Sequence, residues 1–237
     1  MAELKTLSPR KWVANFGGVA PTLDTTDGVY VGDLAVDSST TPNATWRCMV
    51  NTDSAPKWRR HVGGWEDLQV PGLAIKAGVV APDLIGFAGS ASLQVYGFNG
   101  GGTSPIEEVL FTVQMPHSWL LGSDIYPHVH FTPVDANSGT VKWYLEYTFA
   151  ETNAAFPGTS TIATSAVAVA GVAWQHQMVN FSAITPSSSQ DGISAIFAGR
   201  LYRDPGQDTY ASDAAFLGFD IHYQSDGLGS DAEASKS

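Results

Sequence analysis

The sequence predicts an all-β protein whose main part is an antiparallel β-sandwich, and three observations lead to this prediction. Residues 125–132 (IYPHVHFT) and 140–150 (TVKWYLEYTFA) alternate between two sets of side chains, as half-buried strands do. Further strand-like segments follow one another at spacings of roughly 10 to 20 residues, separated by turn clusters. No helical period of apolar residues appears between them, so a sandwich is the expected architecture.

The N-terminal quarter is predicted to be organised differently. Pro9, Gly17, Gly18 and Pro21 interrupt the first 27 residues, which sustain no period and are expected to form an extended arm. From Gly28 to residue 62, three short strand-like runs predict a small β-meander that is too small to be stable alone. The expected domains are therefore residues 1–62, a sandwich of residues 63–224, and a flexible acidic tail of residues 225–237.

Residues 65–90 are rich in glycine and proline and predict an irregular connection with at most one short strand at residues 84–87. The turn-forming sequence DANSG at residues 135–139 is predicted to join its two flanking strands in one sheet. The strands expected in the sandwich are residues 92–98, 109–115, 125–132, 140–150, 163–170, 174–181, 193–202 and 214–224.

One face of the predicted sheet is apolar, and the other carries polar and aromatic side chains. We expect this second face to be an interface between copies of the chain, formed by Tyr126, His128, His130, Tyr144 and His222. The low charged fraction of 15%, against about 25% in ordinary domains, also favours an assembly. Acidification through the histidine pKa of about 6.5 is expected to loosen that assembly, unless Glu146 and Asp220 pair with the imidazoles.

Charge is distributed unevenly along the chain. The net charge of -11 argues against nucleic acid as a partner. Residues 1–62 hold seven of the twelve Lys and Arg against six acids, so this segment is near neutral and the remainder is strongly acidic. This segment combines basic side chains with more aromatic surface than so small a unit can bury, at Trp46, Lys57, Trp58, Arg59 and Arg60. These residues are predicted to dock on an acidic protein surface.

The sequence does not predict a membrane-spanning protein or a secreted one. No run of 18 apolar residues occurs and the N-terminus lacks an apolar signal core, so neither a membrane span nor secretion by that route is predicted. Cys48 is the single cysteine, which excludes an intrachain disulfide, and it is expected to be buried as a small hydrophobic residue.

Three segments carry a resemblance to a known group of proteins. Residues 32–60 (GDLAVDSSTTPNATWRCMVNTDSAPKWRR) look like a small module of bacteriophage structural proteins. With WEDLQVPG at residues 65–72 and EEVLFTVQMPHSWLLGSDIYPHVHFTP at residues 107–133, the chain resembles trimeric β-jelly-roll proteins of tailed-phage virions over most of residues 28–224. The resemblance implies a homotrimeric, non-enzymatic protein on the exterior of the virion. Its role would be capsid decoration (cement) or head fibre, with the major capsid protein or another virion protein as partner.

The alternative within the same resemblance is a tail-fibre or receptor- or glycan-binding head. In that case exposed loops would carry the function, and sugar sites usually present aromatic side chains. The aromatic residues placed for such a site are Tyr96, Phe98, Trp119, Phe156 and Tyr210.

A third hypothesis is a cupin-like metal enzyme. His128 and His130 lie two apart on a predicted strand, so their imidazoles point the same way, as a chelating pair requires. However, Val134 and Asp135 occupy the positions where the cupin motif has glutamate, and only His222 offers a third nitrogen. The adjacent Glu107 and Glu108 are expected to face opposite ways at a solvated strand start, which excludes a cooperating acid and base. We therefore expect no enzymatic activity, no cofactor and no metal.

Overall fold

The computed structural model describes residues 11–14, 34–37, 44–50, 57–62, 64–70, 74–102, 104–169, 171–226, 229–230 and 233. The chain divides into two compact units, Met1–Trp65 with Ser225–Gly229 and Glu66–Gln224 with Ser230–Ser237. We call them the small unit and the sandwich. Within the described ranges the regular structure consists of strands and short 3-10 turns, and no helix could span a membrane.

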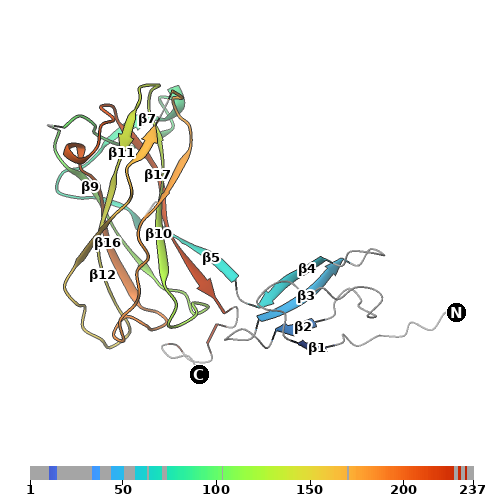
Figure 1. Ribbon diagram of the computed structural model, residues 1–237. Helices are drawn as coiled ribbons and strands as arrows, with labels where there is room; N and C mark the ends of the chain where they lie inside the picture. Colours follow the sequence, from blue (N-terminus) through green and yellow to red (C-terminus); the bar gives the residue numbers. More distant parts are fainter. Residues whose placement is uncertain are drawn as a thin grey trace. The chain divides into compact units, whose positions relative to one another are not determined.

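The small unit contains one four-stranded sheet in the order β1-β2-β3-β4 (Figure 1). The predicted meander corresponds to its antiparallel strands β2 (Leu34–Asp37), β3 (Ala44–Val50) and β4 (Lys57–Val62). The prediction of an irregular arm was wrong for β1 (Lys11–Ala14), which pairs in parallel with β2. The rest of the predicted arm lies outside the described residues.

The sandwich contains two main sheets (Figure 1). The six-stranded sheet has the order β15-β10-β17-β8-β7, with β5 also paired to β17, and the five-stranded sheet has the order β13-β12-β16-β9-β6. A short ladder joins β11 and β14. The strands are β5 (Gly64–Gln69), β6 (Lys76–Ala77), β7 (Asp83–Gly86), β8 (Gln94–Phe98), β9 (Glu107–Gln114), β10 (Ile125–Pro133), β11 (Gly139–Val141), β12 (Trp143–Ala150), β13 (Ser160–Ala163), β14 (Val167–Val169), β15 (Gln177–Asn180), β16 (Ile196–Arg203) and β17 (Ala214–Ser225).

Eight of these strands have the order of a jelly roll. Strands β8, β17, β10 and β15 lie side by side in one sheet, and β9, β16, β12 and β13 lie side by side in the other. The chain therefore crosses from sheet to sheet at most of its connections, as it must in two interlocked Greek keys. The predicted all-β antiparallel sandwich of jelly-roll type is confirmed.

The predicted hairpin around residues 135–139 was wrong. Strand β10 pairs with β15 and β17, whereas β12 pairs with β13 and β16, so the two strands belong to different sheets. The local pattern could not distinguish the two cases, because a strand has one buried face in either sheet. In residues 65–90 strand β7 corresponds to the predicted short strand, but the segment holds more structure than predicted, since β5 pairs with β17 and β6 pairs with β9.

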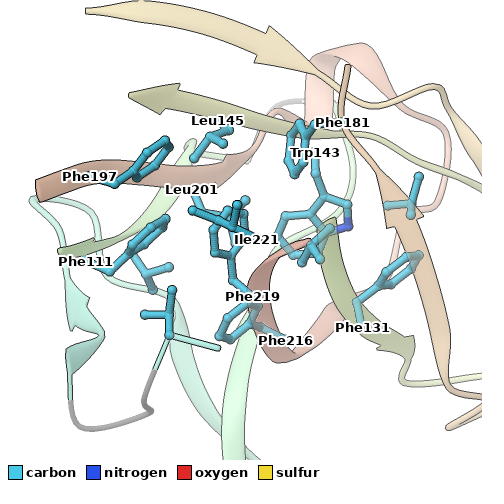
Figure 2. Close-up of a cluster of buried hydrophobic side chains, with 14 of the residues drawn as sticks. Phe111, Phe131, Trp143, Leu145, Phe181, Phe197, Leu201, Phe216, Phe219 and Ile221 are labelled. Atoms are coloured by element: carbon cyan, nitrogen blue, oxygen red, sulfur yellow. The ribbon is translucent and has the colours of Figure 1, made fainter. Parts of the chain in front are cut away.

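Side chains from the inner faces of both sheets fill one apolar core. Figure 2 shows Phe111 and Phe197 of the five-stranded sheet pointing into the same space as Phe219 of the other. The Phe111 and Phe219 ring centroids lie 4.6 Å apart, and Trp143 packs against Phe131 with centroids 5.8 Å apart. This packing fixes the positions of the strands whose outer faces carry the polar residues described below.

One buried cation joins the two sheets at the end of β16. Arg203 has a fully buried side chain and donates through Nε and Nη2 to the two carboxylate oxygens of Asp208, at 2.7 and 3.1 Å. Its remaining N–H groups donate to the backbone oxygens of Phe98 (3.0 Å), Ser212 (2.8 Å) and Tyr210. All five guanidinium donors are therefore used, which is the condition for burying a charge at low cost.

Candidate functional site

The densest group of polar side chains lies on the outer face of the six-stranded sheet. Strands β10 and β17 are antiparallel neighbours, and their register places His128 opposite Asp220 and Tyr126 opposite His222. Because residues two apart on a strand share a face, His130 projects on the same side as His128. The residues that alternate with them on β10, Val129 and Phe131, are fully buried in the core.

Two imidazoles converge on one carboxylate oxygen. The Nε2 atoms of His128 and His130 lie 2.7 and 3.4 Å from Asp220 Oδ1. His128 and Asp220 are buried, with 7% and 5% of their surface exposed, and the three ligand atoms lie within 4.8 Å of one another. No hydrogen bond of good geometry reaches Asp220 Oδ1, although both nitrogens face it. We call these three residues the His-His-Asp cluster.

A second layer of contacts surrounds the cluster. His130 Nδ1 lies 2.8 Å from Nε2 of His176, a residue just before β15. The two nitrogens form a hydrogen bond in which the tautomers of the rings decide which one donates. His222 Nδ1 lies 2.6 Å from Asp67 Oδ1 on β5. The first contact holds the His130 ring with Nε2 toward Asp220, and the second turns His222 toward β5.

A surface hollow of about 410 Å³ opens beside the cluster. Its lining includes His130, His176 and Asp220 together with the apolar Leu217 and the polar Gln69. Solvent and small ligands therefore reach the cluster from the side of His130, while His128 lies deeper.

The two imidazoles have pKa values that shift in opposite directions. Burial lowers the pKa of His128, but the adjacent Asp220 carboxylate outweighs burial and the pKa is raised above its ordinary value. Burial lowers the pKa of His130, and the neighbouring His128 and His176 add to this effect. At a given pH near neutrality, His128 is thus the more protonated of the two.

Four of the five residues predicted for a subunit interface lie on this face. Tyr126, His128, His130 and His222 are brought together, and Tyr126 is 37% exposed. Tyr144 is not among them, because it lies on β12 in the other sheet, where it stacks on Tyr202 with centroids 5.1 Å apart. The predicted interface combined residues of two sheets, because β10 and β12 were expected to be neighbours in one sheet.

The carboxylates predicted to balance the histidines also separate. Asp220 is part of the cluster, whereas Glu146 pairs with Arg200 at 3.2 Å on the five-stranded sheet. Arg200 also donates to Glu108. Glu107 and Glu108 do face different groups, but the prediction that they are solvated was wrong, since both are buried at 5% and 8% exposure.

The predicted docking residues lie on β3 and β4 of the small unit. Trp46 is half-buried on β3, and its indole nitrogen is buried without an acceptor among the described residues. Lys57, Trp58, Arg59 and Arg60 form the first four residues of β4, and their side chains lie outside what the structure describes.

The loop aromatics predicted for a glycan site separate into two groups. Phe98, Trp119 and Tyr210 are completely buried, so their assignment to an exposed binding surface was wrong. Phe156 is 52% exposed and Tyr96 is half-buried. A platform of five loop aromatics is therefore absent from the described part of the sandwich.

Sequence reasoning named Asp220 as an acid that could pair with the imidazoles, but it did not place this residue in a cluster with His128 and His130, and it missed His176. Only His222 was weighed as a third metal-binding group, whereas the structure places Asp220 against both imidazoles and His176 beside His130. Asp220 and His222 are two residues apart on β17, so the alternation of a strand predicts that their side chains project from the same face. Only the register between β10 and β17 could have distinguished them.

The geometry defines an all-β jelly-roll sandwich with a polar cluster on one outer face. No family model matches the chain and no curated protein matches it. Among solved structures it is similar to an arabinose-bound MgGH51 α-L-arabinofuranosidase (12% identity, TM-score 0.37, 66% of this chain and 24% of that chain). It is also similar to TmCBM61 in complex with β-1,4-galactotriose (11% identity, TM-score 0.27, 68% and 86%) and to the carbohydrate-binding module CBM28, specific for non-crystalline cellulose (13% identity, TM-score 0.28, 66% and 89%).

The chain is also similar to the Clostridium thermocellum xylanase 10B modules complexed with xylohexaose (12% identity, TM-score 0.35, 68% of this chain and 26% of that chain). It spans about a quarter of the length of these modules and of the arabinofuranosidase.

Proposed function

We propose that this protein is a non-enzymatic structural protein of a tailed-phage virion, which decorates and stabilises the capsid exterior as a homotrimer. The observation that carries the proposal is the division of the chain into a small, near-neutral β unit rich in tryptophan and a larger, strongly acidic jelly roll. In this arrangement the small unit attaches to the major capsid protein or another virion protein, and the sandwich projects and trimerises.

The composition of the small unit supports its role as the attachment point. Among its described side chains the buried apolar ones are Ala35 and Cys48, both of them small. A four-stranded unit of this size would gain stability from a partner that covers its apolar surface, at about 25 cal/mol per Å². Three such units on one trimer would bind with avidity.

The outer face of the six-stranded sheet supports the trimer. Tyr126, Met178 and Leu217 are exposed at 37%, 52% and 36%, and Met178 lies opposite His130 in the ladder between β10 and β15. This face thus combines large apolar side chains with histidines and few charges. A second copy of the chain can cover such a face without burying unpaired charge.

Light scattering on the full chain tests self-association. We expect a particle of about three times the 25.1 kDa chain mass at micromolar concentration. A stable monomer of 25.1 kDa under the same conditions would contradict the trimer.

Attachment is tested by co-sedimentation of the full chain with phage particles that lack this protein. Trp58→Ala and Arg59→Glu, both in β4 of the small unit, should weaken co-sedimentation while leaving the trimer and its melting temperature unchanged. Lys142→Glu in the sandwich is the matched control and should bind normally. If the β4 variants bind like the wild type and the full chain instead binds glycans on an array, the receptor-binding alternative would replace the proposal.

A further inference from the structure

We infer that the His-His-Asp cluster of the sandwich is a binding site for one divalent transition-metal ion of the zinc class. The cluster lies on the sheet face that is proposed above to form the trimer, but the inference does not rest on the proposed virion role. It depends on the positions of His128, His130 and Asp220, on the state of the carboxylate oxygen and on the hollow beside the cluster.

The spacing of the ligand atoms fits a four-coordinate ion. With metal–ligand bonds of about 2.0 to 2.1 Å, neighbouring ligand atoms of a tetrahedral site lie about 3.3 Å apart. His130 Nε2 and Asp220 Oδ1 already have this separation, at 3.4 Å. His128 Nε2 lies 2.7 Å from the same oxygen and would move outward by roughly half an ångström, which a small side-chain rotation provides.

The carboxylate oxygen has unused capacity to accept. Asp220 is 5% exposed, and its Oδ1 accepts no hydrogen bond of good geometry. A buried carboxylate is costly without a compensating partner, and without an ion the His128 imidazole, 2.7 Å away, is the nearest such partner. An ion between Oδ1 and the two Nε2 atoms would take over this role.

The histidines are held by contacts typical of metal ligands. Ligating histidines usually donate their second ring N–H to a nearby acceptor, which fixes the tautomer and the ring orientation. His130 Nδ1 lies 2.8 Å from His176 Nε2, and the His128 ring hydrogen-bonds the backbone of Tyr126. Both rings therefore direct Nε2 toward Asp220 and the space an ion would occupy.

The donor set selects the class of metal. Two imidazoles and one carboxylate suit Zn²⁺, Co²⁺ or Ni²⁺, whereas Ca²⁺ and Mg²⁺ require oxygen ligands. Three protein ligands leave a coordination position for water or an external ligand, and the hollow of about 410 Å³ lies on that side.

The test is a Co²⁺ titration of the full chain after EDTA treatment and dialysis, followed by the visible absorption of bound cobalt, with Zn²⁺ then added to displace it. We expect one ion per chain with a Kd below about 10 µM. His130→Gln and Asp220→Asn should each weaken binding at least about 30-fold, because each removes a ligand, and His176→Gln should weaken it about 10-fold by releasing the His130 ring.

His222→Gln and His117→Gln are the matched controls and should bind cobalt like the wild type, with unchanged thermal melting. If Asp220→Asn fails to fold, His130→Gln decides, because His130 is partly exposed and its loss leaves the His128 and Asp220 pair in place. The inference is overturned if the wild type gives no cobalt absorption up to about 100 µM metal, or if a folded His130→Gln variant binds as tightly as the wild type.

Discussion

The buried cation Arg203 provides the sharpest stability prediction. In Arg203→Met the side chain keeps an unbranched apolar stem but loses the guanidinium, with its charge and its five donors. The fully buried Asp208 carboxylate then has no cation, which costs about 3 to 5 kcal/mol. Three backbone oxygens also lose their donor, at about 1 kcal/mol each.

The sum, about 6 to 8 kcal/mol, is comparable to the whole stability of an ordinary domain. For about 160 residues of sandwich, the unfolding entropy is about 0.34 kcal/mol per kelvin, so the carboxylate contribution alone lowers the Tm by about 9 to 15 °C. Scanning calorimetry of the full chain measures this shift. We expect Arg203→Met either to melt at least 9 °C lower or to be unfolded as purified.

Two further variants separate the ion pair from general damage to the site. Adding Asp208→Asn to Arg203→Met should recover part of the loss, because the stranded charge is removed. Arg200→Met on the same strand is the matched control and should cost clearly less, since the Arg200 and Glu146 side chains are both 33% exposed and Glu108 keeps the hydrogen bond from the Val79 amide. An Arg203→Met shift below about 2 °C, or a double variant that is no more stable than Arg203→Met alone, would refute the reasoning.

Three other predictions follow from named contacts. Burial raises the pKa of Glu108, but the Val79 amide and Arg200 outweigh burial, so the pKa in the folded protein lies below 4.5. The stabilisation from the Glu108 carboxylate is therefore present above pH 4.5 and is lost as the pH falls through the folded pKa. The urea midpoints of the wild type and Glu108→Gln should converge in acid and remain apart at pH 7. Trp143→Ala should cost about 3 to 5 kcal/mol in urea unfolding, but Trp143→Phe much less, because it removes a buried indole N–H that has no acceptor; equal losses would contradict this. Gly100→Ala should cost about 1 to 3 kcal/mol, since a Cβ would lie 2.4 Å from two backbone oxygens; Gly158→Ala, where the Cβ has open space, should be neutral, and equal stability of the two variants would refute the contact.

The strands were predictable because their signal is local. Alternation in residues 125–132 and 140–150 identified β10 and β12 and the buried positions Val129, Phe131 and Trp143. The pairing of these strands was not predictable in the same way. A five-residue turn can close a hairpin or cross to a second sheet, and strands of either sheet bury one face.

The sequence predicted the two histidines of the candidate site, but it did not predict which carboxylate lies beside them. The spacing of His128 and His130 predicted that the two imidazoles project from the same face, but Asp220 is 90 residues from His130 and meets them only through the register of β17. Arg203 left a usable signal that was not recognised. It has the same strand parity as Phe197 and Leu201, so an inward position followed from alternation, and a buried arginine requires a buried acidic partner.

The strand order has a consequence for how the protein is made. Strand β16 lies between β12 and β9, and β17 lies between β10 and β8, so the central strand of each sheet comes from the last part of the chain. During synthesis the earlier strands of the sandwich can pair only in twos, such as β10 with β15 and β12 with β13, and each pair keeps an unpaired edge, which is a state prone to aggregation. The sandwich can form only when residues 196–225 have left the ribosome, and its many long-range pairings make that folding step slow. A nascent chain stalled near residue 195 therefore holds most of the strands and none of the stable domain.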